Sequence, residues 1–248
     1  ESRLVVAYDV TRVHNLEQMR KDFVDNISHE LRTPLTVLSG YLETFTDQED
    51  FNPRWRRPFE QMQAQTKRMN ALVNDLLLLS RLENDKQLAK NQIVDMPSLM
   101  NQLFDDAQAY NSEYSHILNL DIDSHCDLIG SDVELASAFG NLITNAIKYT
   151  PKGGVITIGW HDDQEHGYFT VEDNGIGIDP KHLPRLTERF YRVDSARSRQ
   201  TGGTGLGLAI VKHVLMQHGA HLEVDSKPNQ GSCFKAVFPK ERLCQAEA

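Results

Sequence analysis

The sequence has few cysteines and no long apolar run. Its 248 residues include three cysteines, Cys126, Cys233 and Cys244, and none belongs to a CxxC pair. Neither a disulfide framework nor a zinc site is indicated, and a reducing compartment fits best. Apolar runs such as Leu76–Leu79 fall far short of the roughly 18–20 residues that a bilayer span needs.

Low-complexity segments and a signal-peptide pattern are also missing, and 40% of the residues are apolar. This length and composition suit one large or two ordinary folded domains in a water-soluble chain. The chain begins at Glu1 without a methionine. We therefore expect a fragment of a longer protein, with any membrane anchor upstream.

Basic residues are scarce in the second part of the chain. Up to Lys90 there are 13 basic and 14 acidic residues, whereas 13 basic residues accompany 21 acidic residues after it. This excess of acid argues against binding of nucleic acid through a broad phosphate-neutralising surface. A nucleotide site in the second part needs a local positive field of its own.

The first part of the chain has helical patterns. Residues 3–10 resemble a strand too short to fold alone, so we assign 1–12 to the end of a truncated domain. Apolar residues at steps of three or four predict a helix over 13–45 and a second from Trp55 to about Glu83. Turn chemistry at 46–53 joins them, and the hairpin domain is expected over 13–90.

Such a hairpin has one thin apolar seam. The first helix alone would be roughly 50 Å long, which is more than a monomeric domain usually supports. Two hairpins that pair into a four-helix bundle close the seam, which predicts a homodimer. The alternative is a monomeric hairpin that docks on the second domain of its own chain.

Residues 91–248 mix helices and strands. Short turns such as KPNQG at 227–231 imply antiparallel hairpins, and the expected fold is an α+β domain with helices on one face of a mixed sheet. The predicted helices are 97–110, 132–149 and 206–218, and the predicted strands are 117–122, 127–129, 155–160, 167–173, 221–226 and 232–238.

The segment SHELRTPL at 28–35 lies inside the first predicted helix. At 100° per residue, Ile27 and Leu31 centre the buried stripe and His29 faces water on the opposite side. Pro34 lacks the amide that would bond the carbonyl one turn earlier, so a kink is expected beside this histidine.

The neighbours of His29 suit nucleophilic chemistry. Glu30 can take a proton from one imidazole nitrogen and leave the other as a neutral nucleophile. Thr33 lies on the same face at i+4, where its hydroxyl can orient a water. Arg32 is either a surface charge or a group that orients phosphate.

All eight residues of SHELRTPL resemble the phosphoacceptor box of sensor histidine kinases. By that resemblance His29 is the phosphoacceptor, Glu30 is the assisting acid or base, and Thr33 supports dephosphorylation of the partner regulator. The segment DVTRVHNLEQMRKDF at 9–23 is similar to the exit of a PAS sensory domain.

The segment NLITNAIKYT at 141–150 places Asn141, Asn145 and Lys148 on one helix face. Asparagine is disfavoured inside helices, so two on one face indicate a function. An amide oxygen suits Mg²⁺, and the lysine offers a point charge to phosphate. The alternative is a polar face with asparagine as filler.

Two glycine-rich segments follow. In DNGIG at 173–177, the carboxylate of Asp173 can accept a hydrogen bond from an exocyclic amine while the ring approaches backbone, although the segment also suits an ordinary turn. GGTGLGL at 202–208 opens a helix and offers free amides to polyphosphate. Its spacing fits neither GxGxxG nor a P-loop.

These segments, with FYR at 190–192 between them, resemble in order the boxes of the ATPase domain shared by histidine kinases, heat-shock-type ATPases and mismatch-repair ATPases. The resemblance implies that Asn145 binds Mg²⁺, Asp173 contacts the adenine amino group, and Tyr149 flanks the adenine. It further implies supporting or phosphate-binding roles for Asn141, Lys148, Gly175, Gly177, Arg192, Gly203, Thr204, Gly205, Leu206 and Gly207.

A long connection at 178–204 carries Arg185, Arg189, Arg192, Arg197 and Arg199. We interpret it as a lid over the triphosphate that supplies the local positive field, docked to the hairpin by Phe190 and Tyr191. The alternative is a solvated loop whose arginines pair with nearby acids such as Asp179, Glu188 and Asp194.

The resemblance implies an ATP- and Mg²⁺-dependent kinase that phosphorylates its own histidine, passes the phosphoryl group to an aspartate of a response regulator, and also dephosphorylates that regulator. Within the family, LTERFYRVD at 186–194 is similar to phosphate-regulon sensors, which implies a phosphate-starvation regulator as partner and the cytoplasmic portion of a bacterial inner-membrane protein. The alternatives are a scaffold that acts mainly as a phosphatase, an anti-sigma-type serine kinase, a chaperone-type ATPase and a non-enzymatic adaptor.

Overall fold

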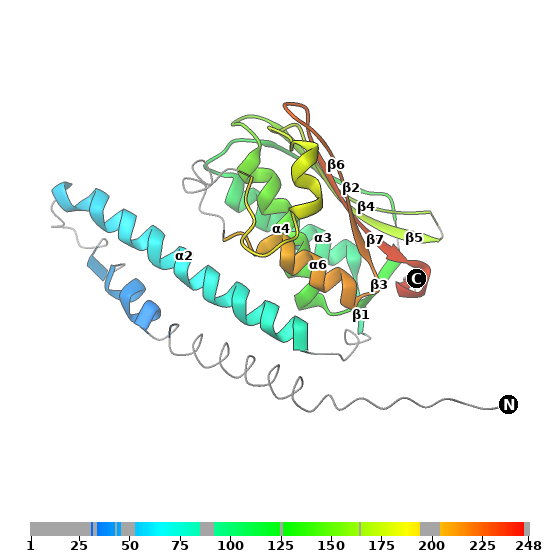
Figure 1. The fold of residues 1–248 in the computed structure, drawn as a ribbon, viewed down its shortest axis with the longest axis horizontal. Helices are drawn as coiled ribbons and strands as arrows, with labels where there is room; N and C mark the ends of the chain where they lie inside the picture. Colours follow the sequence, from blue (N-terminus) through cyan, green and yellow to red (C-terminus); the bar gives the residue numbers. More distant parts are fainter. Residues whose placement is uncertain are drawn as a thin grey trace. The chain divides into compact units, whose positions relative to one another are not determined.

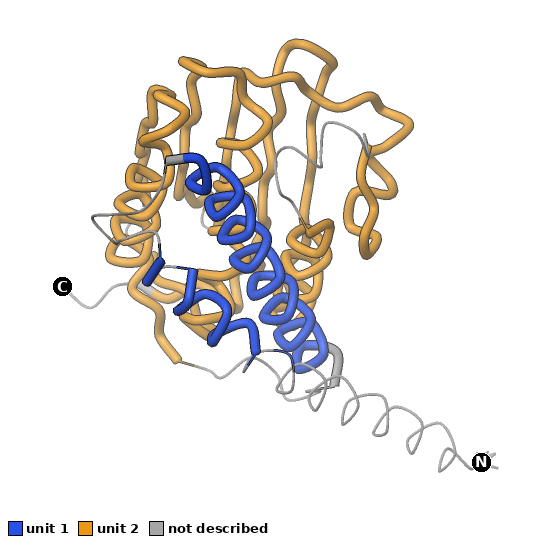
Figure 2. The backbone as a smooth tube through the Cα atoms, turned by 90° about the vertical axis from the view of Figure 1, so that its left-hand side faces the viewer, with its two compact units in different colours: residues 1–84 blue, residues 85–248 orange. Residues whose placement is uncertain are grey.

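The computed structural model describes residues 31, 34–42, 44–45, 53–84, 92–124, 126–163, 165–193 and 204–245. The chain divides into two compact units, unit 1 at residues 1–84 and unit 2 at residues 85–248 (Figure 2). Within the described ranges, every helix is too short or too polar to cross a bilayer.

Unit 1 contains the long helix α2 (Pro53–Asn84) and a preceding helical segment (Figure 1). The Phe45 ring meets the Phe59 ring edge-on, with centroids 5.8 Å apart. Ten residues before Phe45, Leu35 forms a buried cluster with Val73 and Leu77, which lie further along α2. Because these contacts run in opposite directions along the chain, the two helical segments are antiparallel, as the hairpin prediction requires.

Part of the apolar pattern in unit 1 remains uncovered. Leu31, which we expected at the centre of the buried stripe, is 43% exposed in the single chain. The physical reason is that α2 covers one side of the first segment only. Five other exposed apolar residues recur at intervals of seven on the two segments, namely Leu38 (51%), Phe45 (46%), Trp55 (57%), Met62 (45%) and Met69 (46%), whereas the exposed Val37 and Tyr41 do not fall on this spacing.

Unit 2 is built around two sheets. The five-stranded sheet has the order β2-β4-β5-β7-β6, in which β2 and β4 are parallel and all other neighbours antiparallel. Its strands are β2 (Ile117–Ile122), β4 (Val155–Asp162), β5 (His166–Asp173), β6 (His221–Lys227) and β7 (Gly231–Pro239). A three-stranded sheet, β1-β3-β8, joins β1 (Gln92–Val94), β3 (Cys126–Gly130) and β8 (Leu243–Gln245).

Three helices of unit 2, α3 (Met96–Asn111), α4 (Asp132–Tyr149) and α6 (Gly207–Gln217), lie on one side of the larger sheet (Figure 1). Buried residues alternate with more exposed ones along β5, whereas β4 has three buried residues in a row, Ile158–Trp160. Phe139 of α4 stacks on Phe169 of β5 with centroids 3.8 Å apart and meets Phe238 of β7 edge-on. These rings, all fully buried, form the core between the helices and the sheet.

Local sequence explains where the helices begin and end. The carboxylate of Asp95 accepts a hydrogen bond from Ser98 N at 2.8 Å and caps α3. At the C-terminal end of the next helix, α4, Thr150 is extended and Pro151 follows it, so this helix stops at Tyr149.

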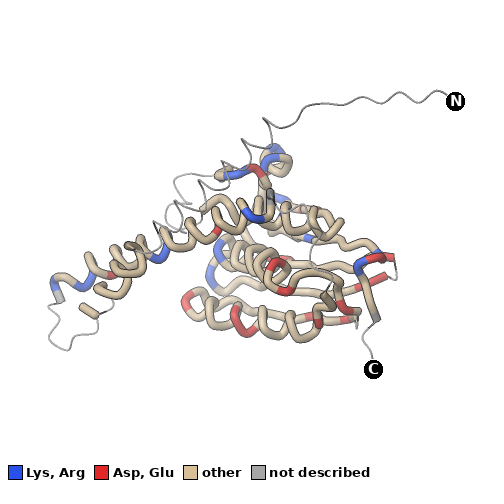
Figure 3. Tube along the Cα trace, turned by 90° about the horizontal axis from the view of Figure 1, so that it is seen from below, with Lys and Arg blue, Asp and Glu red and all other residues tan. Residues whose placement is uncertain are grey.

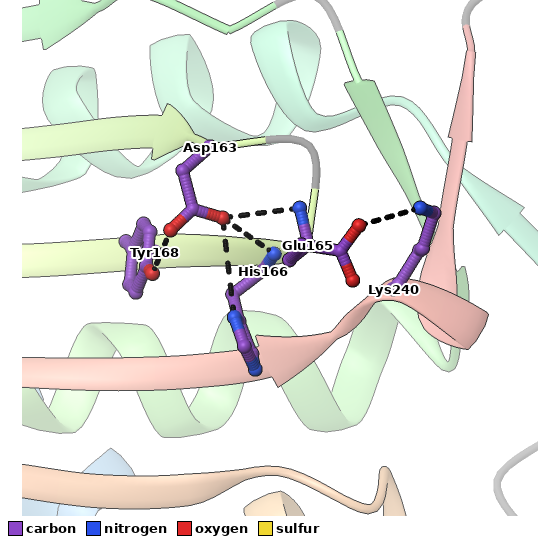
Figure 4. A network of polar contacts seen from close by, with 5 residues as sticks. All are labelled: Asp163, Glu165, His166, Tyr168 and Lys240. Carbon is purple, nitrogen blue, oxygen red and sulfur yellow. Dashed lines mark hydrogen bonds and ion pairs between the residues drawn. The ribbon is translucent and has the colours of Figure 1, made fainter.

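The β4–β5 turn is closed by polar contacts at the end of β5 away from Asp173 (Figure 4). The Asp163 carboxylate accepts hydrogen bonds from His166 N at 2.8 Å and from the Tyr168 hydroxyl at 2.5 Å. The Tyr168 hydrogen bond is the main reason why the pKa of this exposed carboxyl is lowered. Lys240 pairs with Glu165 at 2.8 Å and ties the turn to the end of β7.

The elements agree closely with those predicted from periodicity, and two ranges, 117–122 and 132–149, coincide with them. The three-residue strands β1 and β8 were not predicted. The first part of the predicted lid instead forms a short 3-10 helix, η1 (Pro180–Arg185).

Candidate nucleotide site

The predicted site falls into two groups of residues. His29, Glu30 and Thr33 lie outside the described residues, as do Gly203, Arg197 and Arg199. Their predicted roles remain predictions. The nucleotide-binding segments at 141–150, 173–177 and 204–208 belong to unit 2 and are described.

Asn141 joins α4 to the start of α6. Its amide nitrogen donates to Ser137 O at 2.9 Å. A Cβ added to Gly207 would collide with the Asn141 side chain. Gly207, the first residue of α6, therefore allows the two helices to approach closely at this end.

Asn145 and Lys148 follow on the same face of α4, and both are half-buried. Within the described ranges, the Asn145 side chain makes no hydrogen bond, so its amide oxygen can accept a ligand. The Lys148 ammonium lies 6.0 Å from the centroid of the Tyr110 ring. Tyr149, the last residue of α4, keeps its side chain partly exposed, as a residue that flanks a bound base must.

Asp173 ends β5 and is a buried residue, only 7% exposed. Its Oδ1 accepts a hydrogen bond from Gly175 N at 2.8 Å. Burial raises the pKa of Asp173, and hydrogen bonds from the amides of Gly175 and Ser232 act in the opposite direction. A buried carboxylate of this kind favours a ligand that donates a hydrogen bond.

The glycines of DNGIG are required by close contacts. A Cβ on Gly175 would lie 2.6 Å from Asp173 Oδ1 and 2.6 Å from Tyr149 O. Gly177 has φ +62° and leaves no room for a side chain beside the Lys227 carbonyl. Ile176 N donates to Tyr149 O at 3.2 Å, so this loop is attached directly to the end of α4.

The start of α6 is the third part of the candidate site, after α4 and the DNGIG loop. Thr204 Oγ1 accepts a hydrogen bond from Leu206 N at 3.2 Å, and Leu206 is fully buried. Gly205 has φ +77°, and its carbonyl accepts a hydrogen bond from Phe190 N at 2.8 Å. The first amides of α6 have no partner within the helix, which makes this end suitable for phosphate.

The lid over the triphosphate at 178–204 stays a prediction. Arg185 pairs with Glu188 at 3.0 Å, as the alternative interpretation expected, so it contributes little free positive charge. Arg192 is half-buried beside Tyr191. The pKa of His213 on α6 is lowered mainly by burial and next by Arg189, which places positive charge near this helix. Acidic residues are scattered over the helices and strands of unit 2 (Figure 3).

Known proteins share this arrangement. The family model for the His Kinase A (phospho-acceptor) domain matches residues 19–85. The model for the histidine kinase-, DNA gyrase B- and HSP90-like ATPase matches residues 130–242. The chain is also 56% identical over 245 residues to the phosphate regulon sensor protein PhoR of Pseudomonas aeruginosa, covering 98% of this chain. The chain belongs to the sensor histidine kinases.

Other histidine kinases are similar over nearly the same range. PhoR of Haemophilus influenzae is 44% identical over 239 residues, and WalK of Bacillus subtilis is 39% identical over 246 residues. The chain spans 55% of the length of each of the two PhoR proteins and 39% of WalK.

Solved histidine kinases have the same fold. Full-length ShkA in complex with AMPPNP aligns with a TM-score of 0.74 at 24% identity, over 92% of this chain and 47% of that one. AdeS of Acinetobacter baumannii aligns with a TM-score of 0.63 at 24% identity, over 86% of this chain and 98% of that one.

One part of this histidine-kinase site was not predicted from the sequence. The β6–β7 hairpin supports the DNGIG loop, because Asn229 N donates to Ile176 O at 2.7 Å and Ile178 N donates to Ser226 Oγ at 2.8 Å. Ser226 Oγ also lies 2.9 Å from Ser232 Oγ. Both serines are buried, and a serine on each of two neighbouring strands is the one signal in the sequence that could have indicated this support.

The residues present fit a magnesium ion held mainly by nucleotide. The described part of the chain has no cluster of three His, Cys, Asp or Glu side chains that would form a protein cage. Mg²⁺ is commonly bound by one or two protein oxygens together with substrate phosphates. The half-buried Asn145 amide, one turn from Lys148, matches that donor set.

Proposed function

We propose that this chain is the catalytic portion of a phosphate-regulon sensor kinase that uses ATP and Mg²⁺ to phosphorylate His29. The observation that carries the proposal is the direct contact between the four segments of the candidate nucleotide site, at 141–150, 173–177, 190–192 and 204–208. Tyr149 O accepts from Ile176 N, Asn141 packs on Gly207, and Phe190 N donates to Gly205 O. Motifs that are far apart in sequence thus surround one site.

The buried carboxylate of Asp173 selects the base. When ionised, it accepts a hydrogen bond from the adenine amino group, while Gly175 and Gly177 let the ring approach the backbone. The exposed ring of Tyr149 covers one edge of the base. These groups favour adenine because guanine offers a carbonyl where the carboxylate needs a donor.

The phosphates extend toward α6. Lys148, Arg192 and the amides at 203–207 supply positive charge and donors in a domain that is otherwise acidic. Asn145 is the protein ligand of Mg²⁺, with Asn141 as support. When bound, Mg²⁺ neutralises charge on the transferring phosphoryl group.

His29 attacks as the neutral imidazole. A histidine with the reference pKa of about 6.5 is neutral in most molecules at neutral pH. Glu30 accepts the remaining ring proton as the bond to phosphorus forms and the bond to ADP breaks. The phosphoryl group then passes to an aspartate in the receiver domain of a PhoB-like response regulator, and Thr33 orients the water that removes it from that regulator.

Two copies of unit 1 form the dimer. Most of the uncovered apolar residues of the two segments recur every seven residues, which is the repeat of a helical bundle. A second hairpin covers them, and the single chain does not. We assign 13–90 to this dimerisation domain, 91–248 to the ATP-binding domain and 1–12 to the end of a PAS-like domain in a membrane-anchored bacterial protein.

The experiment that tests this function follows the chemistry of the label. The chain is incubated with γ-labelled ATP and Mg²⁺, and the label is tested for stability in acid and in base. A phosphohistidine is labile in acid and stable in base, and we expect transfer of the label to the regulator. An acid-stable label would indicate a serine kinase, and ATP turnover without a phosphoprotein would indicate a chaperone-type ATPase.

A further inference from the structure

Tyr191 is held by a cluster of side chains beside the phosphate side of the site. The Nδ1 atom of His182 and the Tyr191 hydroxyl share a hydrogen bond of 2.6 Å. The Arg185 guanidinium lies 4.2 Å from the centroid of the Tyr191 ring, and it also pairs with Glu188. Tyr191 is therefore fixed both at its hydroxyl and on its ring face.

The helix that carries His182 is attached to the base-binding loop. Asp179 caps η1 by accepting from Lys181 N at 3.1 Å. Immediately before it, Ile178 N donates to Ser226 Oγ on β6 at 2.8 Å. His182 is therefore held in place from the DNGIG side of the site.

The residue before Tyr191 contacts the start of α6. Phe190 has φ +60°, which is unfavourable for a residue with a side chain, so its neighbours must hold it there. Phe190 N donates to Gly205 O at 2.8 Å, and a Cβ on Gly205 would lie 3.0 Å from Phe190 Cα. The conformation of Phe190 thus determines how closely its segment packs on Gly205, next to the start of α6.

We propose that His182 is a positioning residue for the phosphate side of the nucleotide site, acting through Tyr191. The His182–Tyr191 hydrogen bond fixes the chain on one side of Phe190, and Gly205 fixes it on the other. Loss of this bond loosens Phe190–Arg192 and the amides before α6. It leaves Asp173 and Gly175, which contact the base, in place. The inference rests on the proposed nucleotide site.

Three variants separate the hydrogen bond from the bulk of the side chains. Tyr191→Phe removes only the hydroxyl and keeps the ring under Arg185. His182→Leu removes the ring nitrogen. His182→Asn retains an amide nitrogen near the position of Nδ1 and should restore the bond. Tyr168→Phe is the matched control, because it removes a tyrosine hydroxyl bonded to Asp163 at the far end of β5 (Figure 4).

The measurement compares the affinity of the full 248-residue chain for ATP with its affinity for adenosine. Tyr191→Phe and His182→Leu should each weaken ATP binding by about three- to tenfold, the usual effect of one lost hydrogen bond. Their affinity for adenosine should not change. His182→Asn and Tyr168→Phe should bind both ligands as the wild type does. The double variant His182→Leu/Tyr191→Phe should bind ATP no more weakly than either single variant, because both changes remove the same hydrogen bond.

Other results would overturn the proposal. Unchanged ATP affinity in both Tyr191→Phe and His182→Leu would exclude a positioning role. An equal loss for ATP and adenosine, together with a lower melting temperature, would indicate a purely structural contact. If the wild type bound neither ligand, the proposed nucleotide site itself would be wrong, which is a different failure.

Discussion

The two units of the chain bury their apolar residues to different extents. In unit 2, Trp160, Phe139 and Phe169 are fully buried between the helices and the sheet. In unit 1, a small cluster around Leu35 is buried, while apolar side chains on both segments face solvent. Unit 2 therefore completes its core within one chain, whereas unit 1 leaves apolar surface that the proposed dimer would cover.

Removing a core ring of unit 2 should have the largest effect. Phe139→Ala should lower the free energy of unfolding of unit 2 by about 3–5 kcal/mol, since it leaves a cavity against Phe169 and Phe238. The two tryptophans report the units separately, because Trp160 is buried in unit 2 and Trp55 is exposed in unit 1. In a Trp55→Phe background, urea unfolding followed by Trp160 fluorescence measures this loss.

The loss in Phe139→Ala should not depend on protein concentration. A dependence on concentration would show that unit 2 also relies on the dimer, which would remove the contrast between the units.

A charge on the exposed stripe of unit 1 should weaken the dimer. Met62→Glu places a carboxylate where a second hairpin is expected to pack, and a cost of about 2 kcal/mol raises the dissociation constant roughly thirtyfold. Gln61→Glu adds the same charge at the neighbouring exposed position and is the control. Sedimentation velocity over a range of concentrations measures both. Equal association of the two variants would contradict the assigned dimer face.

Asp173 should make nucleotide binding sensitive to pH. Burial raises its pKa, so as pH falls it takes up a proton at a higher pH than an exposed aspartate does and stops accepting from the base. ATP affinity should fall as the pH drops through this raised pKa. Titration calorimetry of the wild type and of Asp173→Asn at decreasing pH tests this, and the same pH dependence in both would show that Asp173 does not contact the base.

The raised pKa of Asp173 affects folding stability in the opposite sense, because a fall in pH favours the folded state while it weakens ATP binding. A carboxyl whose folded pKa is raised favours the folded state at low pH, and that contribution is lost as the pH rises through the raised pKa. Asp173→Asn should therefore unfold at a higher urea concentration than the wild type at pH 7.5 while it binds ATP poorly. A variant that loses both stability and binding would indicate a structural role.

The smallest expected effect concerns a buried hydroxyl. Thr150 Oγ1 is buried and has no hydrogen-bond partner among the residues that the structure describes. Thr150→Val removes that hydroxyl at equal size and should stabilise unit 2 by about 1 kcal/mol. Thr170→Val, at a half-exposed position of β5, should change the stability little. A destabilised Thr150→Val would show that the hydroxyl has a partner in solution.

Much of unit 2 could be predicted from local sequence. The 3.6-residue period and the proline that follows its end determine α4, and alternation determines β2, so these ranges were predicted without error. The strands β1 and β8 were missed, because three residues carry no measurable period and exist only through pairing with β3. The Arg185–Glu188 pair was anticipated only as an alternative, since spacing alone does not separate a paired arginine from a free one.

The site was harder to predict than the elements. Its motifs identified the residue types, but the contact between Asn141 and Gly207 depends on how two helices pack. The supporting serines, Ser226 and Ser232, belong to no motif and were missed. Leu31 is exposed because α2 covers only one side of the first segment, and the apolar period alone does not show which side that is.

The proposed assignment of ATP binding to unit 2 and of the phosphorylated histidine to unit 1 is tested most directly by two variants in one assay. His29→Ala and Asp173→Asn are each measured for ATP affinity and for acid-labile label from γ-labelled ATP. We predict that His29→Ala binds ATP as the wild type does and carries no label, and that Asp173→Asn binds weakly and is labelled slowly. Label on His29→Ala, or full affinity in Asp173→Asn, would contradict the account.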